Sequence, residues 1–373
     1  MSEHRISEMT VHVVRMPVKE VHSHGSGDVS AINSVLLELT TESGITGWGE
    51  ASPWPAFTGI VEASAAALHV HLRDLVIGAD PVKVEVIMTQ VERQLVGNPE
   101  AKSALECALL DVTGQICGFS ISELLGGQQR AVIPLSFSVA NRDFARDIDC
   151  VQSLWDDGIR LFKVKAGFDA HSFDLMRLTK LRSLYGDEIQ LRVDYNQGLP
   201  AVDAVRRIRD LESFALDFVE QPVQRHEVSV MADIAHAVAV PIMADESVFT
   251  PFDALHGATI RMADIYSLKI NKSGGMRRSH EIAAIARAAG IDIYGGCMFE
   301  TSIAHAAGTH MLAALPGLRL GCEFYMSSYY AEADLAETEF PVKNGFVHVP
   351  TGPGLGIRPA RDKLERYRCE MLK

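Results

Sequence analysis

Apolar and polar residues alternate with two different periods along this chain. Over residues 1–130, runs with strand-like alternation come first and runs with helical spacing follow, whereas over 131–344 the two kinds of run take turns. The segment SVLLELTTESGITGWGEA (34–51) predicts a hairpin with its turn at Glu42-Ser43-Gly44. Helical spacing then predicts helices over 61–72, 81–95 and 99–116.

The alternating part of the chain predicts a barrel. Amphipathic segments such as 172–186 and 276–290 separate short apolar runs, and the units recur every ~25 residues, as barrel units do. The runs that predict strands are 132–139, 161–166, 189–196, 215–221, 240–246, 263–271, 291–296 and 318–323. A doubly wound sheet would alternate similarly, but no Gly-rich nucleotide loop follows an early strand. We predict an α/β fold, with a (β/α)8-type barrel over 131–344 and an N-terminal α+β capping domain over 1–130.

The last part of the chain is rich in turn residues. NGFVHVPTGPGLGI (344–357) contains one short strand-like run between glycines and prolines. We expect residues from about 345 to 373 to return to the N-terminal domain and complete it.

Composition and charge argue against several classes of binding partner and cellular location. The 373 residues include 35 basic and 48 acidic side chains, a net charge of −13, which argues against nucleic acid and anionic membranes as partners. No apolar run approaches the ~20 residues of a membrane span, and MSEHRISEMT lacks the pattern of a signal peptide. The cysteines, which have no paired CxxC spacing, are at positions 107, 117, 150, 297, 322 and 369. Unpaired cysteines indicate reduced thiols, so we expect a cytoplasmic protein.

Three acidic residues recur at the predicted strand ends, one barrel unit apart. Asp194, Glu220 and Asp245 each follow a strand, and chemistry in a barrel gathers at the carboxyl ends of its strands. Three carboxylates converging on one point repel each other unless a cation joins them. Oxygen ligands favour a hard divalent ion, so the spacing predicts a Mg²⁺ or Mn²⁺ site. A single acid here would be read as a helix cap or a solvated loop residue.

Lysines accompany these acids. Lys163 and Lys165 lie two apart in LFKVKAGF, so a strand presents both on the same face, and Lys269 follows Asp245 by about one further unit. Clustered ammonium groups lower one another's pKa, which would provide a neutral amine as a base near neutral pH. We therefore interpret these lysines as acid/base groups opposite each other across the barrel mouth.

Together these motifs resemble the enolase superfamily and, within it, the muconate lactonizing enzyme subgroup. The resemblance covers nearly the whole chain, including GITGWGEA and the terminal GPGLGI. The motifs that carry it are KVK (163–165), DYN (194–196), EQP (220–222), ADES (244–247) and KINKSGG (269–275).

The resemblance implies roles for individual residues. Asp194, Glu220 and Asp245 would bind the metal, and Asn196 and Glu246 would support it from the surrounding shell. Lys165 and Lys269 would be the acid/base pair on opposite faces of the substrate, with Lys163 tuning Lys165 and touching the substrate carboxylate. The reaction class implied by the superfamily is removal of a proton next to a carboxylate through an enediolate that a divalent metal stabilises.

Departures from the family patterns narrow the subgroup. A mandelate-racemase-type His-Asp base is absent, since Lys269 and GGCMFE (295–300) occupy those places. Dipeptide epimerases carry Asp-x-Asp after the eighth strand, where this chain has Cys322-Glu323-Phe324-Tyr325. Muconate lactonizing enzymes have a similar Glu, followed by a different stretch. GCEFYMSSYY (321–330) is more similar to the branch that acts on hydroxyproline and related cyclic amino acids.

Substrate choice is expected to lie with a mobile lid and with the barrel mouth. The segment 19–30 is rich in glycine and polar residues between two strands, as a lid is. Its histidines have no partners at zinc-site spacing, so they are interpreted as solvated, with substrate contact as the alternative. The residues we expect around the substrate are His22, His24, Trp54, Phe57, Cys297, Glu300, Glu323 and Tyr325.

The leading hypothesis is an enzyme that acts on a small carboxylate, most simply an amino-acid or proline derivative. It would dehydrate the substrate, as a cis-3-hydroxyproline dehydratase does, or racemise or epimerise it. The alternative is a muconate-type cycloisomerase, and outside enzymes a non-catalytic barrel scaffold. The resemblance also implies a homo-oligomer, from dimer to octamer.

Overall fold

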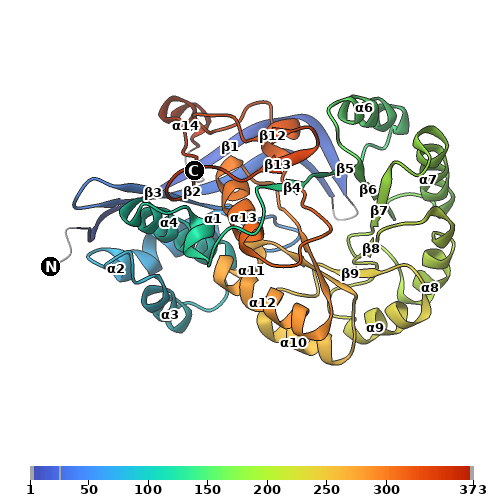
Figure 1. Cartoon of the computed structure of the whole chain (residues 1–373), viewed down its shortest axis with the longest axis horizontal. Coiled ribbons are helices and arrows are strands. Elements are labelled where there is room, and N and C mark those ends of the chain that lie inside the picture. Colours follow the sequence, from blue (N-terminus) through green and yellow to red (C-terminus); the bar gives the residue numbers. More distant parts are fainter. Residues whose placement is uncertain (1–3, 25–26, 370–373) are drawn as a thin grey trace.

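The computed structural model of the protein describes residues 4–24 and 27–369 (Figure 1). Within these ranges, the structure describes only the backbone of residues 20, 22–24, 27 and 28. The predicted lid side chains His22 and His24 therefore lie outside the described residues. In the part of the chain that is described, no helix is both long and apolar enough to cross a membrane.

An antiparallel sheet opens the chain. Its three strands are β1 (Ile6–His24), β2 (Gly27–Thr41) and β3 (Thr46–Ala51), in that spatial order. The predicted hairpin is confirmed, since Val35 pairs with Ala51 and Thr40 with Thr46. Gly44 closes the turn at φ 84°, a backbone conformation that glycine adopts without steric cost.

Helices pack on this sheet. They are α1 (Val61–Ala66), the π-helical turn Ala67–Leu72, α2 (Arg73–Val76), α3 (Val84–Gln94), α4 (Pro99–Cys117) and α5 (Ile121–Leu124). Helix α4 is buried along most of its length and lies directly against β3. A side chain at Gly49 would overlap the carbonyl of Ala104, so the glycine in GWG permits this close approach.

Seven parallel strands form the main sheet, in the order β11-β10-β9-β8-β7-β6-β5. The strands are β5 (Ser136–Val139), β6 (Leu161–Lys165), β7 (Gln190–Asp194), β8 (Val219–Glu220), β9 (Ile242–Ala244), β10 (Ile265–Leu268) and β11 (Asp292–Gly295). The helices that follow them are α6 (Phe144–Asp156), α7 (His171–Tyr185), α8 (Ala201–Arg209), α9 (Val228–Ala237), α10 (Pro251–Thr259), α12 (Met276–Ala289) and α13 (Ser302–Ala314). Figure 1 shows α6 to α10 following one another around the outside of the strands.

The eighth predicted strand, 318–323, is reduced to Cys322. This residue forms parallel bridges with Leu135 beside β5 and with Gly295 at the end of β11, so it joins the two edges of the sheet. The (β/α)8-type barrel with its N-terminal α+β domain is thereby confirmed. The strand is short because Gly321 turns the backbone at φ 81° directly before Cys322.

The first predicted strand and the C-terminal segment meet outside the barrel. The run 132–139 divides into β4 (Val132–Pro134) and β5, and β4 pairs with β13 (Phe346–His348) beside β12 (Val342–Lys343). A short helix, α11 (Ile270–Ser273), precedes α12, and α14 (Arg361–Tyr367) lies against β1. The tail thus contacts β1 and β4, while the domain limits given by the sequence stay predictions.

Candidate active site

Three carboxylates meet at the carboxyl ends of neighbouring strands. Asp194 ends β7, Glu220 ends β8, and Asp245 directly follows β9. The register pairs Asp194 with Glu220 across the two strands, and all three side chains are buried. The parallel sheet therefore brings together acids that the sequence spaces one barrel unit apart.

Each predicted lysine ends at one of these carboxylates. Lys163 Nζ lies 2.5 Å from Glu220 Oε2 and 3.5 Å from Asp194 Oδ2. Lys165 Nζ donates to Asp194 Oδ2 at 2.6 Å, and Lys269 Nζ donates to Asp245 Oδ2 at 2.5 Å. The structure thus brings all three lysines and all three acids into one buried cluster.

The expected lowering of the lysine pKa is wrong for Lys163 and Lys269, whose pKa values are both raised. Burial alone would lower the pKa of Lys163, but Glu220, Glu323 and Asp194 outweigh burial and hold the pKa well above the ordinary value. Lys163 and Lys165 both contact Asp194 Oδ2, so a carboxylate lies between the two ammonium groups. The strand tolerates two buried like charges because each is compensated by acids at the ends of other strands.

Lys272 is a member of the cluster that sequence reasoning missed. Its Nζ donates to Asp245 Oδ1 at 2.8 Å, to the Asp245 carbonyl at 2.8 Å and to the Ser267 carbonyl at 2.9 Å. Despite burial, Lys269 and Lys272 hold the pKa of Asp245 below its ordinary range. The available signal was the second lysine in KINK. A side chain at Gly296 would overlap Lys269, so this glycine leaves room for that lysine.

The carboxylates fit a hard divalent cation. Burial first, and then Asp194 and Asp245, raise the pKa of Glu220 well above its ordinary value. Glu220 Oε1 is buried and has no hydrogen-bond partner among the described residues. An orphaned carboxylate oxygen between two other acids is the environment in which a cation with oxygen ligands is stable.

The predicted supporting residues lie at the edge of the cluster. Asn196 Oδ1 accepts a hydrogen bond from Lys165 Nζ at 3.0 Å, and Asn196 Nδ2 donates to Glu246 Oε1 at 3.4 Å. Burial, Asp245 and Asp194 raise the pKa of Glu246 to about 8. Both residues thus contact groups that surround the predicted metal position.

Gln221 organises the loop after β9, a role that the sequence did not reveal. Its Oε1 accepts from the backbone N–H groups of Asp245 and Ser247, both at 3.1 Å. Its Nε2 donates to Ser247 Oγ at 2.8 Å and to the Val223 carbonyl at 2.9 Å. The amide in EQP therefore fixes the direction in which Asp245 projects.

A small cavity of about 30 Å³ lies above the cluster. Its walls include Trp54 from the N-terminal part of the chain. Its other lining residues are Ser138, Lys163, Lys165, Asp194, Asn196, Lys269, Cys297, Met298, Phe299, Glu323, Tyr325 and Met326. Phe57 stacks on Trp54 with ring centroids 6.0 Å apart, and its ring lies 4.6 Å from Lys269 Nζ. The aromatic pair therefore covers one side of Lys269.

Residues that follow the eighth strand position, Cys322, form another wall of this cavity. Glu323 Oε1 lies 2.7 Å from Lys163 Nζ and accepts from Ser138 Oγ at 2.9 Å. The Cys297 thiol donates to the Glu323 carbonyl at 3.0 Å. Tyr325 packs on Phe137 with ring centroids 4.4 Å apart. Four of the predicted substrate contacts, namely Trp54, Cys297, Glu323 and Tyr325, thus line the cavity.

Glu300 differs from these residues. It does not line the cavity and is buried behind its wall, where Asn271 Nδ2 donates to Glu300 Oε1 at 2.8 Å. Glu300 was expected among the substrate contacts, but its side chain lies on the far side of the cavity wall from the cluster of lysines and acids.

A closed parallel barrel with acids and lysines at its strand ends, capped by an α+β domain, defines an enzyme of the enolase type. The chain belongs to the enolase superfamily and, within it, to the muconate lactonizing enzyme subgroup. Residues 146–363 match the family described as "Enolase C-terminal domain-like". Residues 6–126 match "Mandelate racemase / muconate lactonizing enzyme, N-terminal domain".

Characterised relatives span almost the whole chain. Chloromuconate cycloisomerase CbnB of Cupriavidus necator is 32% identical over 368 residues, which cover 97% of this chain and 99% of that protein. L-Ala-D/L-Glu epimerase of Bacillus subtilis is 30% identical over 348 residues, covering 92% and 94%.

Solved structures agree with these relatives. Muconate lactonizing enzyme from Pseudomonas fluorescens, complexed with muconolactone, superposes with a TM-score of 0.95 at 32% identity, covering 99% of this chain and 100% of that one. A muconate cycloisomerase from Azorhizobium caulinodans has a TM-score of 0.87 at 40% identity, covering 99% of both chains.

These similarities set the class of activity. The protein is an enolase-superfamily enzyme of the isomerase or lyase type, and enzymes of this family generally depend on a divalent metal ion. The relatives described above are cycloisomerases and an epimerase, and none of them is a dehydratase. The leading expectation of a hydroxyproline dehydratase is therefore not supported, whereas its cycloisomerase alternative is.

Proposed function

We propose that the protein is a muconate-type cycloisomerase. It adds one carboxylate of an unsaturated dicarboxylic acid to the acid's own double bond and so closes a lactone. The similarity to cycloisomerases over nearly the whole chain supports this activity.

The ion pair between Lys163 and Glu323 is the observation that carries the proposal. Dipeptide epimerases of the subgroup place Asp-x-Asp after the eighth strand to hold the substrate's amino group, and muconate lactonizing enzymes have Glu there. In this chain the Glu323 carboxylate already pairs with Lys163 at 2.7 Å, an ammonium that it shares with Glu220, and it accepts from Ser138. Because a carboxylate that already has a cationic partner attracts a second ammonium group less strongly, a substrate without an amino group fits this wall better.

The chemistry requires one proton and no redox partner. An oxygen of one carboxylate forms a C–O bond to the double-bond carbon that is β to the other carboxylate. The π electrons of the double bond move onto the α-carbon and this second carboxylate, which together form an enediolate. An ammonium group then transfers its proton to the α-carbon, which forms the C–H bond. Solvent returns a proton to the amine.

The lysines supply this proton and the opposing charge. We assign the proton transfer to Lys165, which lines the cavity and is held by Asp194 and Asn196. Burial lowers the pKa of Lys269, but Asp245, Glu220 and Glu246 together raise it above its ordinary value. Lys269 therefore remains an ammonium at neutral pH and stabilises the negative charge from the opposite side.

Asp194, Glu220 and Asp245 would hold Mg²⁺ or Mn²⁺, which when bound supplies positive charge at the enediolate oxygens. Asn196 and Glu246 would orient these ligands. The small-carboxylate substrate, the homo-oligomer and the cytoplasmic location belong to the same proposal.

The test offers cis,cis-muconate to the purified protein with Mg²⁺ or Mn²⁺ in D₂O. We expect the absorbance of the conjugated diene to disappear and a lactone to form with one deuterium next to its carboxylate. An intact diene with both metals, under conditions where a known muconate cycloisomerase turns over, would contradict the proposal.

Epimerisation of an amino-acid derivative is a second candidate. It is favoured by Lys165 and Lys269, which line one cavity from β6 and β10 on opposite sides of the barrel. The similarity to an L-Ala-D/L-Glu epimerase points the same way. A panel of dipeptides, amino acids and proline derivatives in D₂O separates the two, because epimerisation exchanges the α-proton with inversion and forms no lactone.

A further inference from the structure

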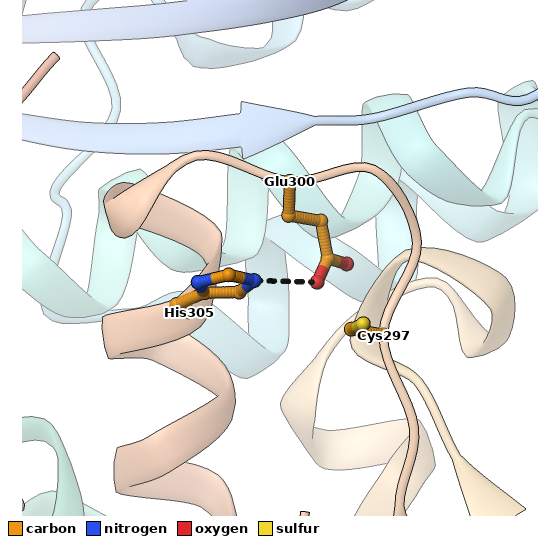
Figure 2. Close-up of side chains that lie close together, drawn as sticks. All are labelled: Cys297, Glu300 and His305. Carbon is orange, nitrogen blue, oxygen red and sulfur yellow. Dashed lines mark ion pairs between the residues drawn. The ribbon is translucent and has the colours of Figure 1, made fainter. Parts of the chain in front are cut away.

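A second group of potential metal ligands lies in and behind the wall of the active-site cavity. One ligand atom each from Cys297, Glu300 and His305 lies within 4.8 Å of the others. Figure 2 shows the His305 ring and the Glu300 carboxylate pointing toward each other, with Cys297 on the loop beside them. Cys297 and Glu300 come from the loop after β11, and His305 from the first turn of α13.

Within this group, the buried ring nitrogen Nε2 of His305 lacks a hydrogen-bond partner among the described residues. The whole His305 side chain is fully buried. Glu300 Oε2 lies 3.8 Å from Nε2, too far for a hydrogen bond. A buried nitrogen without a hydrogen-bond partner is unfavourable, and a bound cation would satisfy its lone pair.

The remaining polar atoms of the group are already positioned by neighbours. His305 Nδ1 lies 3.0 Å from Ser327 Oγ, which can accept the ring proton and leave the Nε2 lone pair free. Asn271 donates to Glu300 Oε1 at 2.8 Å, which leaves Oε2 on the side of His305. Partners on the outer atoms of a histidine and a carboxylate are the arrangement that orients metal ligands.

We propose that Cys297, Glu300 and His305 form a binding site for Zn²⁺ or a similar borderline cation, distinct from the carboxylate site at Asp194, Glu220 and Asp245. Thiolate and imidazole select zinc over the hard ions that oxygen ligands prefer.

Charge supports this assignment, whereas the distances require a small adjustment. A thiolate and a carboxylate together neutralise a divalent cation, and binding releases the thiol proton to solvent. A nitrogen and an oxygen bound to tetrahedral zinc lie about 3.3 Å apart. The 3.8 Å between His305 Nε2 and Glu300 Oε2 therefore has to shorten by about half an ångström when the ion binds. The Cys297 sulfur lies within 4.8 Å of both other ligand atoms and would also have to move closer to them when the ion binds.

Occupancy of this site would act on the active site through Cys297. The Cys297 thiol lines the cavity and donates to the carbonyl of Glu323, whose carboxylate is the partner of Lys163. A thiolate bound to zinc has no proton to donate, so this contact is lost. Zinc is therefore expected to inhibit turnover whatever the substrate, and the metal-binding test below does not depend on the proposed reaction.

Cobalt provides a specific probe, because a Co²⁺–thiolate bond absorbs in the near ultraviolet and Co²⁺ bound to oxygen ligands does not. The purified protein is stripped of metal, saturated with Mg²⁺ and titrated with Co²⁺, and the affinity for Zn²⁺ is then measured by competition with a chromophoric chelator. We expect one equivalent of Co²⁺ to produce the band and one equivalent of Zn²⁺ to abolish it.

Two conservative variants define the site. Cys297→Ser can still donate to the Glu323 carbonyl but removes the sulfur, so the band should vanish. Glu300→Gln can still accept from Asn271 but removes the anionic ligand, so the affinity for Zn²⁺ should fall about tenfold or more. Cys117→Ser is the matched control, since Cys117 is an exposed thiol at the end of α4 and outside this group of ligands.

The outcomes are decisive either way. Loss of the band in Cys297→Ser, its retention in Cys117→Ser and weaker zinc binding in Glu300→Gln support the site. Co²⁺ binding without the band places the ion at the carboxylates alone and overturns the proposal. A band that survives in Cys297→Ser, or zinc binding unchanged in Glu300→Gln, overturns it as well.

Discussion

At the scale of single residues, the active site consists mainly of buried lysines whose charges are compensated by neighbouring carboxylates. Lys163 and Lys269 are buried, and each lies 2.5 Å from a carboxylate oxygen, of Glu220 and Asp245 respectively. Removing one partner of a buried pair costs about 3–5 kcal/mol, because the other charge is left uncompensated. Substitutions here should therefore be isosteric, so that function is affected more than folding.

Glu220→Gln keeps the shape of the side chain and removes one anionic oxygen ligand. We expect the affinity for Mg²⁺ and the turnover rate to fall together, each by about tenfold or more. Calorimetric titration with Mg²⁺ and steady-state kinetics measure the two quantities. Glu188→Gln, at an exposed position, is the control. Activity that persists unchanged in metal-free buffer would remove the metal assignment from all three acids.

Replacement of each active-site lysine by Met should separate their roles. Lys165→Met should lose turnover by about 10²-fold or more, because the proton donor is absent. It should also fail to exchange the α-proton of the lactone in D₂O. Lys269→Met should lose turnover yet still exchange that proton, since Lys165 remains. Lys180→Met, on the exposed face of α7, is the control, and full turnover in Lys165→Met would show that Lys165 is structural.

At the scale of elements, Glu50 joins the N-terminal sheet to the barrel. It lies on β3 with its carboxylate buried at the N-terminus of α13, where it accepts from Thr301 N at 2.9 Å, Thr301 Oγ1 at 2.5 Å and Ala304 N at 2.9 Å. Ser34 and Ser52 donate to the same carboxylate at 2.8 and 2.7 Å. A negative charge at this helix end is favourable because the first N–H groups of a helix are unpaired.

Glu50→Gln should loosen this connection. The amide replaces one accepting oxygen by a donor that faces N–H and hydroxyl groups, so we expect a loss of about 1–3 kcal/mol in the free energy of unfolding. The loop before α13 also carries Cys297 into the cavity wall, so turnover should fall as well. Urea unfolding and kinetics measure both, with Glu8→Gln on the exposed side of β1 as the control. Wild-type stability in Glu50→Gln would show that this carboxylate is not a connection between the domains.

At the scale of the whole molecule, His310 connects three distant parts of the chain. From α13 it approaches Ser122 Oγ of α5 at 3.3 Å and the carbonyl of Leu355 in the C-terminal segment at 3.1 Å. Since a carbonyl only accepts, Nε2 carries the proton and Nδ1 accepts from the serine. Burial lowers the pKa of His310 to about 4 from the ordinary 6.5, so the ring is neutral in the folded protein.

This histidine makes stability depend on pH in a defined window. Between pH 6.5 and about 4 the unfolded chain binds a proton at His310 that the folded protein does not, so stability falls as the pH falls. The contribution is about 3 kcal/mol, from 1.36 kcal/mol per pKa unit. His310→Gln, which can still donate to Leu355, should flatten the difference in unfolding free energy between pH 7 and pH 4. Urea titrations at the two pH values measure this difference. The same difference in the variant and in the wild type would rule this role out.

The sequence alone determined the barrel, the three acids and the three lysines. Strand ends recur once per barrel unit, and side chains two apart in a strand share a face, so local periodicity was sufficient to place Asp194, Glu220, Asp245 and the KVK pair. The family resemblance followed from the same short motifs and was confirmed by the comparisons.

Only the tertiary structure decided which groups neutralise one another. The pairing of Lys163 with Glu323, the role of Lys272 and the reduction of the last strand to Cys322 depend on elements far apart in the chain. The burial of Glu300 beside His305 depends in the same way on where α13 packs. Periodicity fixes the face on which a side chain lies, but the packing of distant elements fixes its neighbours, and those neighbours set its charge, its pKa and its ligands.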